Sequence, residues 1–428
     1  MTMAGDSTRP TPWLVALIRE PTKDQWLAWW AAWLGWTLDA FDFTVFLLIM
    51  VPISKEFNVP LYEVTAVFTI TLWLRLIGAT ASGWLADRIG RKAPLMISIA
   101  GYSLCNFIAG FSPTFMFLFF FRALLGIFMG AEWPAGASLA MESWPTRTRG
   151  FMSGALQGSW NLGFLLSSLA YGLLYDLIGW RGLLMMGILP AFALIYIRLY
   201  VKEPPVWLEN RRQQRLQKRE VRVPLLSIFK RGVRSNTATA CWWMASAFVV
   251  YYSINALFAT YLQRDLHLSP GLVAMPIALA NLLAFIGSCF WGWSADHIGR
   301  RWAMIIPGAL TVAVAPIYLW TGDYTWIVAG FALQGLFGGA IYGQQPSYLC
   351  ERFPTEVRST ASGFCYHQGA IWGGFVAPLL TALAGSYGTT LAIPMMIGTM
   401  VGATSFVIAL LNSPETKGTE MVADLVVA

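Results

Sequence analysis

Long apolar segments alternate with short polar ones along most of the chain, and most approach the roughly 20 residues that a helix needs to cross a bilayer. Six of these spans precede a basic stretch at 202–235 and six follow it. They cover 26–51, 62–86, 93–111, 114–140, 148–175 and 181–201, then 236–263, 270–295, 302–320, 324–349, 357–385 and 388–411. The pattern predicts an all-α polytopic membrane protein with about 12 transmembrane helices in two six-helix bundles, 26–201 and 236–411.

Two motifs recur at a constant separation, which indicates that the bundles are copies of one unit. Gly83-Trp-Leu-Ala-Asp87-Arg-Ile-Gly90-Arg91-Lys92 returns as Gly292-Trp-Ser-Ala-Asp296-His-Ile-Gly299-Arg300-Arg301. Glu142-Ser-Trp-Pro145 returns as Glu351-Arg-Phe-Pro354, and 83 to 292 and 142 to 351 are both steps of 209 residues. An even number of spans per unit gives both copies the same orientation, so we expect parallel repeats about an axis along the membrane normal.

The charges of the loops predict the orientation of the chain. Alternate loops are rich in Lys and Arg, whereas the opposite loops carry only Lys55, Arg181 and Arg264. By the positive-inside rule, the basic loops face the cytoplasm. Both termini are then cytoplasmic, with tails at 1–25 and 412–428 and a cytoplasmic linker at 202–235, in a multi-pass protein of the inner or plasma membrane.

Composition narrows the class of protein. Only 12% of the residues are charged, against about 25% in a soluble domain. The net charge of +7 comes from short loops between apolar spans, so we expect no nucleic-acid partner. The five cysteines have no disulfide or metal spacing, and no catalytic constellation is present. We therefore expect no cofactor, no metal and no enzyme activity, in a monomer that works in the lipid bilayer; a membrane-bound sensor or enzyme is the alternative from another class.

The first span carries two carboxylates, Asp39 and Asp42, at membrane depth. Ionisable residues there cost a few kcal/mol and are functional candidates by default. Three apart on a helix, the two share a face, and close carboxylates resist full ionisation. We predict a proton-coupling site; the alternative is a structural anchor paired with cations of neighbouring helices. Glu132, in the fourth span, is either a second proton carrier or a packing anchor.

Two arginines inside spans are candidates for an anion site. Arg75 lies mid-span, about 18 Å from Asp87 at 1.5 Å per residue, and Arg122 lies in the outer half of the fourth span. Arginine stays charged at ordinary pH, and its planar guanidinium suits a carboxylate. We predict that Arg75 exchanges between Asp39 or Asp42 and a substrate carboxylate; a permanent ion pair with the first helix is the alternative.

Neutral polar residues complete the predicted substrate site. Gln157 and Asn161 are four apart and therefore share a helix face. His367 is either a neutral hydrogen-bonding partner of the substrate, a group that titrates near neutral pH, or a structural histidine. The remaining candidates are Tyr252, Asn255 and Gln344.

The doubled motif predicts a latch between the two halves. Asp87 and Asp296 can pair with loop cations or cap a neighbouring helix N-terminus, and such contacts would break as the halves rock. The predicted latch comprises Gly83, Asp87, Arg91, Glu142, Arg149, Asp296, Arg300, Glu351 and Arg358. Through this motif, nearly the whole chain resembles the major facilitator superfamily. The resemblance implies two six-helix bundles, a central cavity and alternating access.

Other stretches resemble particular branches of that superfamily. Asp39-Ala-Phe-Asp42 is similar to the first helix of aromatic-acid, sialic-acid and fungal lactate and pyruvate symporters, and Arg122-Ala-Leu-Leu-Gly126-Ile-Phe-Met-Gly130-Ala-Glu132-Trp-Pro134 is closest to the sialate and monocarboxylate group. This implies proton-coupled symport of a small organic carboxylate, with a lactate- or pyruvate-like monocarboxylate favoured and a sialic or aromatic acid as the alternative. It also implies that Arg122 matters for anion transport.

Two further branches remain as alternatives. A sugar porter is suggested by Glu203-Pro-Pro-Val-Trp-Leu and Pro414-Glu-Thr-Lys-Gly418, which look like sugar-porter signatures. The seventh span lacks the paired glutamines of that branch. A drug:proton antiporter would carry a Gly-Pro pair in the fifth helix, and Gly158-Ser-Trp-Asn-Leu-Gly163 has no proline.

Overall fold

The structure is a computed structural model that describes residues 12–219, 224–268, 270–423 and 425–426. In these residues the regular structure consists of helices, and no strand is present. Parts of the predicted tails and linker, namely 1–11, 220–223, 424 and 427–428, lie outside the described residues.

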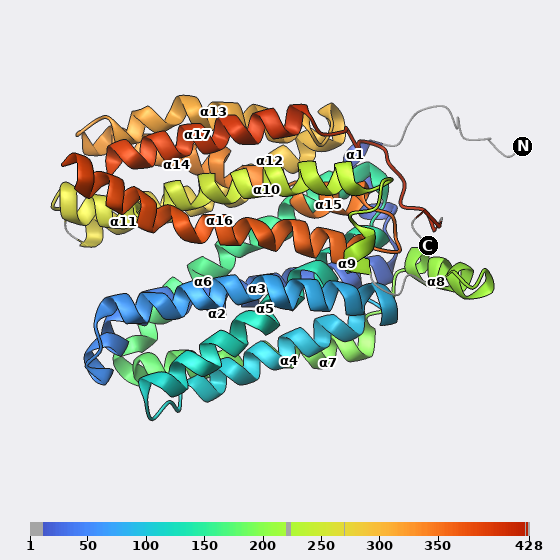
Figure 1. The fold of residues 1–428 in the computed structure, drawn as a ribbon, viewed down its shortest axis with the longest axis horizontal. Coiled ribbons are helices and arrows are strands. Elements are labelled where there is room, and N and C mark those ends of the chain that lie inside the picture. The colour runs from blue at the N-terminus through green and yellow to red at the C-terminus, as the bar shows by residue number, and fades with distance from the viewer. Residues whose placement is uncertain (1–11, 220–223, 269, 424, 427–428) are drawn as a thin grey trace, which may run out of the picture.

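The N-terminal half is a bundle of long helices (Figure 1). Its members are α2 (Lys23–Phe57), α3 (Leu61–Ile89), α4 (Lys92–Ala109), α5 (Phe115–Ser143), α6 (Arg149–Met185) and α7 (Ala191–Tyr200), with short 3-10 turns η1 (Thr146–Thr148) and η2 (Met186–Ile188). The spans predicted at 148–175 and 181–201 follow each other with a sharp bend, because Gly179 adopts φ 63°, outside the helical region.

The C-terminal half repeats this plan in the same register. Its long helices are α10 (Arg234–Asn255), α12 (Pro270–Ile298), α13 (Trp302–Leu319), α14 (Tyr324–Gln334) with α15 (Gln345–Arg352), α16 (Arg358–Tyr387) and α17 (Ala392–Leu411). A shift of 209 residues carries the bounds of α3 onto those of α12, and the bounds of α5 onto the start of α14 and the end of α15. The predicted duplication is therefore confirmed element by element.

The number of membrane crossings agrees with the predicted twelve. Ten segments of the described residues are long and apolar enough to span a bilayer. One of them, Thr146–Tyr200, is 55 residues long and contains the bend at Gly179, so it makes two crossings. Adding α4, which lies along α5 at full bundle length (Figure 1), gives twelve.

The span predicted at 324–349 is not one continuous helix. Between α14 and α15 the chain forms a π turn, η4 (Gly335–Gly339), and a 3-10 turn, η5 (Ala340–Tyr342). A Cβ at Gly335 would lie 2.1 Å from the carbonyl oxygen of Ala280 in α12. The glycine-rich segment therefore packs closely against α12, and its helix is irregular there.

The two bundles meet along two helix pairs, α6 with α12 and α3 with α16. Short helices gather at one end of the molecule: α1 (Trp13–Arg19), α8 (Pro205–Leu216) and α9 (Pro224–Ser227) (Figure 1). Residues 412–423 and 425–426 also lie there, while α11 (Phe258–Thr260) and the π turn η3 (Tyr261–Asp265) lie at the other end. We call the first end, which carries the repeated Gly-Trp-X-Ala-Asp motifs, the latch end.

Candidate functional site

A buried ion pair joins α2 and α3 inside the membrane spans. Arg75 Nη2 lies 2.5 Å from Asp39 Oδ2, and the two side chains are only 6% and 0% exposed. The guanidinium stands over the rings of Phe43 and Trp160, at 5.0 and 5.6 Å. Gly130 allows α5 to pack directly on this turn of α3, because a Cβ there would lie 2.0 Å from the Arg75 carbonyl oxygen. Asp39 is thus the partner of Arg75 among those predicted.

The second carboxylate of α2 does not share this arginine, which corrects the expectation that both acids face one site. Arg122 Nη1 donates to Asn106 Oδ1 at 3.1 Å and to the backbone oxygen of Asp42 at 3.5 Å. The Asp42 carboxylate itself accepts no hydrogen bond within the described part of the chain. Three residues rotate an α-helix by about 300°, so the side chains of Asp39 and Asp42 point about 60° apart. Asp42 therefore faces α4 and α5 instead of α3.

Glu132 of α5 lies against the same face of α2, one turn before Asp39. A Cβ at Gly35 would stand 2.3 Å from Glu132 Oε1, so a side chain there would displace the carboxyl group from this position. Glu132 is 1% exposed, and its Oε2 has no hydrogen-bond partner among the described residues. As expected, Glu132 and Arg122 are not paired with each other.

Aromatic side chains of both halves line the seam beside the Asp39–Arg75 pair. Trp36 lies 4.9 Å from Trp160, and Trp133 stacks on Tyr366 at 4.1 Å between ring centroids. Phe248 contacts the edge of Tyr366 at 5.4 Å. Trp36, Trp133, Tyr366 and Phe248 were not singled out from the sequence, because aromatic residues in apolar spans are usually packing residues and only the meeting of the two halves distinguishes these.

Several of the residues predicted for a substrate site lie together here. Gln157 accepts from Trp133 Nε1 at 3.1 Å and donates to the Tyr366 hydroxyl at 3.3 Å. His367 is buried, lies 4.9 Å from the Tyr366 ring and contacts the Gly363 oxygen of its own helix through Nδ1. Tyr252 stacks on Phe248 at 6.2 Å, and Asn161 is half-buried next to Trp160.

Two predicted members of the substrate site lie elsewhere. Asn255 is exposed at the end of α10 opposite the latch, and its amide donates to the Tyr251 oxygen of its own helix. Gln344 is fully buried at the start of α15, where its neighbours Gly343 and Ser347 both contact Ser153 of α6. The length of α10 places Asn255 far from the Asp39–Arg75 pair. The break between α14 and α15 directs Gln344 into the packed region between the two halves.

The contacts expected of the repeated motif are present at one end of the molecule. Asp87, at the end of α3, accepts the backbone N–H groups of Ser359 and Thr360 at 3.0 and 2.9 Å, which are the first turn of α16. A Cβ at Gly83 would lie 2.6 Å from the Thr360 Cα, so glycine permits this approach. Arg91 binds Asp87 at 2.9 Å, and Glu142 receives both Arg91 and Arg358, at 2.7 and 2.6 Å. Carboxylates at a helix N-terminus are stabilised by its unpaired N–H groups.

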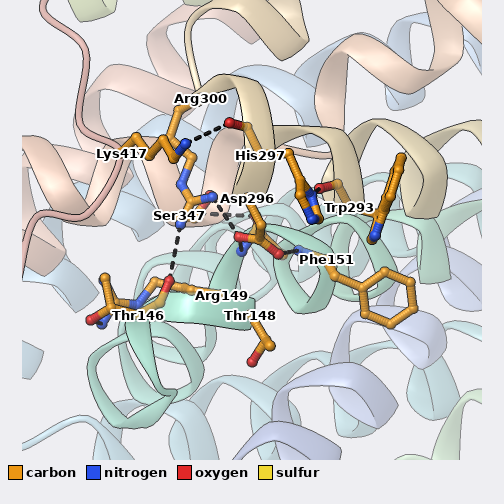
Figure 2. A network of polar contacts seen from close by, with 12 residues as sticks. Thr146, Thr148, Arg149, Phe151, Trp293, Asp296, His297, Arg300, Ser347 and Lys417 are labelled. Carbon is orange, nitrogen blue, oxygen red and sulfur yellow. Dashed lines mark hydrogen bonds and ion pairs between the residues drawn. The ribbon is translucent and has the colours of Figure 1, made fainter. Parts of the chain in front are cut away.

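The second copy of the motif makes the equivalent contact with the N-terminus of α6 (Figure 2). Asp296 accepts the N–H groups of Gly150 and Phe151 at 2.8 and 3.0 Å and binds Arg300 at 2.7 Å. Arg300 and Arg149 both reach Glu351, each at 3.2 Å. Each half therefore caps a helix of the other half, and all nine predicted latch residues lie in these two clusters or beside them.

Two glutamates complete the latch and were not predicted to be part of it. The Glu203 carboxylate accepts the backbone N–H groups of Arg91 and Lys92 at 2.7 and 2.9 Å, and Glu415 accepts those of Arg300 and Arg301 at 2.8 and 3.1 Å. Burial raises the pKa of Glu203, against the N–H groups that lower it. Burial alone would lower the pKa of Arg91, but Glu142 and Asp87 outweigh it and the pKa lies above its usual value. The Glu-Pro-Pro stretch that begins at Glu203 and the Pro-Glu-Thr stretch that contains Glu415 were the sequence signals by which these two glutamates could have been found.

A sequence model of the family described as "Major Facilitator Superfamily" matches residues 32–280 and 244–422. The chain belongs to the major facilitator superfamily. It is therefore a multi-pass membrane transporter and not an enzyme.

Individual members of the superfamily match along most of their length. The "Sialic acid transporter NanX" of Escherichia coli (strain K12) is 26% identical over 87% of this chain and 91% of its own. The "Cis,cis-muconate transport protein" of Acinetobacter baylyi is 26% identical over 84% of this chain and 87% of its own. Among solved structures, the proton:xylose symporter XylE superposes with a TM-score of 0.71 at 19% identity, covering 92% of this chain and 97% of that one. The last match establishes the fold alone.

Proposed function

We propose that the protein is a proton-coupled symporter that imports a small organic carboxylate across the inner or plasma membrane by alternating access. The observation that carries the proposal is the buried Asp39–Arg75 pair at the seam between the halves. An arginine side chain inside a membrane needs an anion beside it, because guanidinium groups stay charged at ordinary pH. Asp39 supplies that anion until a substrate carboxylate replaces it.

The exchange couples proton and substrate through charge balance. Asp39 Oδ1 and Arg75 Nε have no hydrogen-bond partner in the described residues, so each group has an unused site beside the 2.5 Å contact. When Asp39 takes a proton, the attraction to Arg75 falls, and a substrate carboxylate can bind the guanidinium through two parallel hydrogen bonds. The loaded carrier then has the same net charge as the resting one, which favours movement of the halves with both proton and substrate bound.

The lining of the site bears on the size and shape of the substrate. Trp36, Trp160, Tyr252 and Tyr366 offer flat apolar surface beside the cation. Such surface favours a planar, unsaturated or aromatic carboxylate over a small hydrophilic one. The related sialic acid and muconate transporters are named for larger acids. We therefore rank unsaturated and aromatic acids first and keep lactate, pyruvate and sialic acid as further candidates.

A sugar is the second candidate class. The fold neighbour is named as a xylose symporter, and Glu203 and Glu415 belong to stretches that look like sugar-porter signatures. A sugar does not require the buried Asp39–Arg75 pair, since it brings no charge for Arg75 to bind. Sugars therefore serve as the comparison set in the transport test. We do not propose drug antiport.

Uptake into proteoliposomes tests the proposal. An inward proton gradient should drive accumulation of at least one acid from a panel of cis,cis-muconate, benzoate, nicotinate, sialate, lactate and pyruvate, while xylose should not accumulate. Asp39→Asn should lower that accumulation by about a hundredfold or more, since a proton-transfer group of this kind contributes that much. Asp176→Asn, an exposed acid near the other end of α6, is the matched control and should behave as wild type.

Two outcomes would sink the proposal. One is accumulation of xylose but of none of the acids. The other is accumulation of an acid that Asp39→Asn leaves unchanged.

A further inference from the structure

A row of buried polar atoms without hydrogen-bond partners lies inside the N-terminal half, on the side of α2 that faces α4. It comprises the Tyr102 hydroxyl, Asn106 Nδ2, Glu132 Oε2 and both carboxylate oxygens of Asp42. All four residues are at most 1% exposed. More than nine in ten buried polar groups in proteins are hydrogen-bonded, so several unpaired groups in one place require an explanation.

The four residues form a line between two carboxyl groups. Tyr102 and Asn106 are one turn apart on α4 and therefore share a face. Asn106 holds Arg122 through its Oδ1 at 3.1 Å and directs its Nδ2 towards the Asp42 carboxylate without an aligned hydrogen bond. The Tyr102 hydroxyl faces the Glu132 carboxyl in the same unaligned way. One hydroxyl and one amide thus stand between Asp42 and Glu132.

The line continues beyond Glu132 to the seam between the halves. A cavity of about 10 Å³ lies between α2, α5 and α6, bounded by Glu132, Trp36, Trp133 and Gln157. That volume is about what one water molecule occupies. Gln157 is hydrogen-bonded to Tyr366 of α16, so the cavity adjoins the aromatic lining of the central site.

We propose that Asp42, Tyr102 and Glu132 form a proton path inside the N-terminal half, running behind the Asp39–Arg75 pair to the cavity at Gln157. The proposal rests on the proton symport proposed above and assigns its route. A tyrosine hydroxyl is both donor and acceptor, so Tyr102 can give its proton to Glu132 while it takes one from the Asp42 side, directly or through a bridging water. Tyr102 loses one proton and gains one, so its charge is unchanged; Asp42 becomes ionised, and Glu132 stays protonated until it passes the proton on to the cavity. Asn106 is a positioning residue that fixes Arg122 and Asp42.

The path separates two tasks that α2 would otherwise have to perform at one carboxylate. Asp39 is held by Arg75 and exchanges with the substrate anion, whereas Glu132 touches neither Arg75 nor Arg122. The charged and titratable groups around the line are Asp39, Arg75, Arg122 and Cys105. Glu132 is positioned by Gly35, where a Cβ would displace its carboxyl group.

Infrared difference spectra of the full-length protein in lipid, recorded across a pH step, test the path without any substrate. Glu132→Gln should remove one carboxyl band from the wild-type spectrum, and Tyr102→Phe should shift that band, because the carboxyl loses its neighbour. Tyr318→Phe is the matched control. Tyr318 is also fully buried with an unpartnered hydroxyl, but it lies on α13, the counterpart of α4 in the other half. Its spectrum should equal that of wild type.

Transport supplies the second readout. Glu132→Gln and Tyr102→Phe should lower proton-driven accumulation by about tenfold or more, while exchange of the same labelled acid across the membrane at equal pH stays within about twofold. Gly35→Ala, which displaces the carboxyl instead of removing it, should act in the same direction and covers the case in which Glu132→Gln fails to fold. Exchange lost in proportion to accumulation would overturn the path, because it would indicate general damage.

The two proposals can fail separately. Wild-type protein that accumulates no acid contradicts the symport, and the infrared spectra still decide the path. Carboxyl bands unchanged in both Glu132→Gln and Tyr102→Phe, or changed equally by Tyr318→Phe, overturn the path while leaving the symport at Asp39–Arg75 intact.

Discussion

Arg75 and Arg122, which both lie inside membrane spans, each contact a group on another helix. Arg75 has Asp39, and Arg122 has Asn106 and the Asp42 backbone. Breaking a buried pair by removing one member typically costs about 3–5 kcal/mol, because the other charge is left without compensation. The same rule is weaker at the surface, where Glu56 meets Arg181 at 2.6 Å with both side chains partly exposed.

The Glu56 contact gives a pH dependence of stability. Burial works against ionised Glu56, but hydrogen bonds from Arg181 and Trp180 outweigh it and lower the pKa of Glu56 below its usual value of 4.5. An acid with a lowered pKa in the folded state stabilises the protein above its unfolded pKa, and that contribution is lost as the pH falls through the folded pKa. We expect Glu56→Gln to lower the Tm slightly at neutral pH and not at all in acid well below pH 4.5. Thermal unfolding at both pH values measures this, and a deficit that persists in acid contradicts the assignment.

Two helices of this protein begin without a capping side chain of their own and receive one from the opposite half. The N-terminus of α16 is capped by Asp87 and that of α6 by Asp296, and neither helix has a side-chain cap from its preceding residue. A helix N-terminus carries about half a positive charge, so the carboxylate gains both hydrogen bonds and a favourable field. The two caps therefore join the halves at the latch end, and we expect them to break if that end opens.

Weakening one cap should open the latch end. Asp87→Asn keeps the shape but removes the charge, and we expect the population open at that end to rise about tenfold, the equivalent of about 1.4 kcal/mol. Cys350 reports this, because it is fully buried on α15, where that helix packs against α5 and α6 of the other half. Its rate of alkylation, followed by mass spectrometry of its peptide, should rise to the same degree. Asp176→Asn should leave the rate unchanged, and an unchanged rate in Asp87→Asn argues against the cap as a latch.

At the scale of the whole molecule, the two halves share one architecture but differ in chemistry. The helix bounds repeat at 209 residues, yet the positions 209 residues after Asp39, Asp42, Arg75, Arg122 and Glu132 carry no charged residue. The N-terminal half therefore supplies charge, and the C-terminal half supplies aromatic and neutral polar surface such as Tyr252 and His367. Figure 1 shows α1 and the C-terminal end of the described chain at the latch end, as an even number of crossings requires, and that end also carries the basic loops.

This arrangement predicts a cytoplasmic latch end with both termini beside it. Green fluorescent protein fused after Ala428 should fluoresce, and alkaline phosphatase at the same place should be inactive. Fusions after Gly322, in the loop between α13 and α14 at the opposite end, should give the reverse pattern. Phosphatase activity at the C-terminus would contradict this orientation and would place the latch end on the opposite side of the membrane.

The sequence by itself determined the architecture, the duplication and the positions of the repeated motif, and it predicted a latch and a charged site that remain to be tested. Apolar spans, loop charges and a motif repeated at a fixed step are properties of the linear chain, so twelve helices and residues such as Asp87 and Asp296 could be predicted from it. Which buried groups meet could not be read in this way, because pairing depends on the rotation of each helix about its own axis. Only the tertiary structure separated Asp39 from Asp42, brought Trp133 to Tyr366 across the seam, broke the helix before Gln344, and left Tyr102 and Glu132 facing each other.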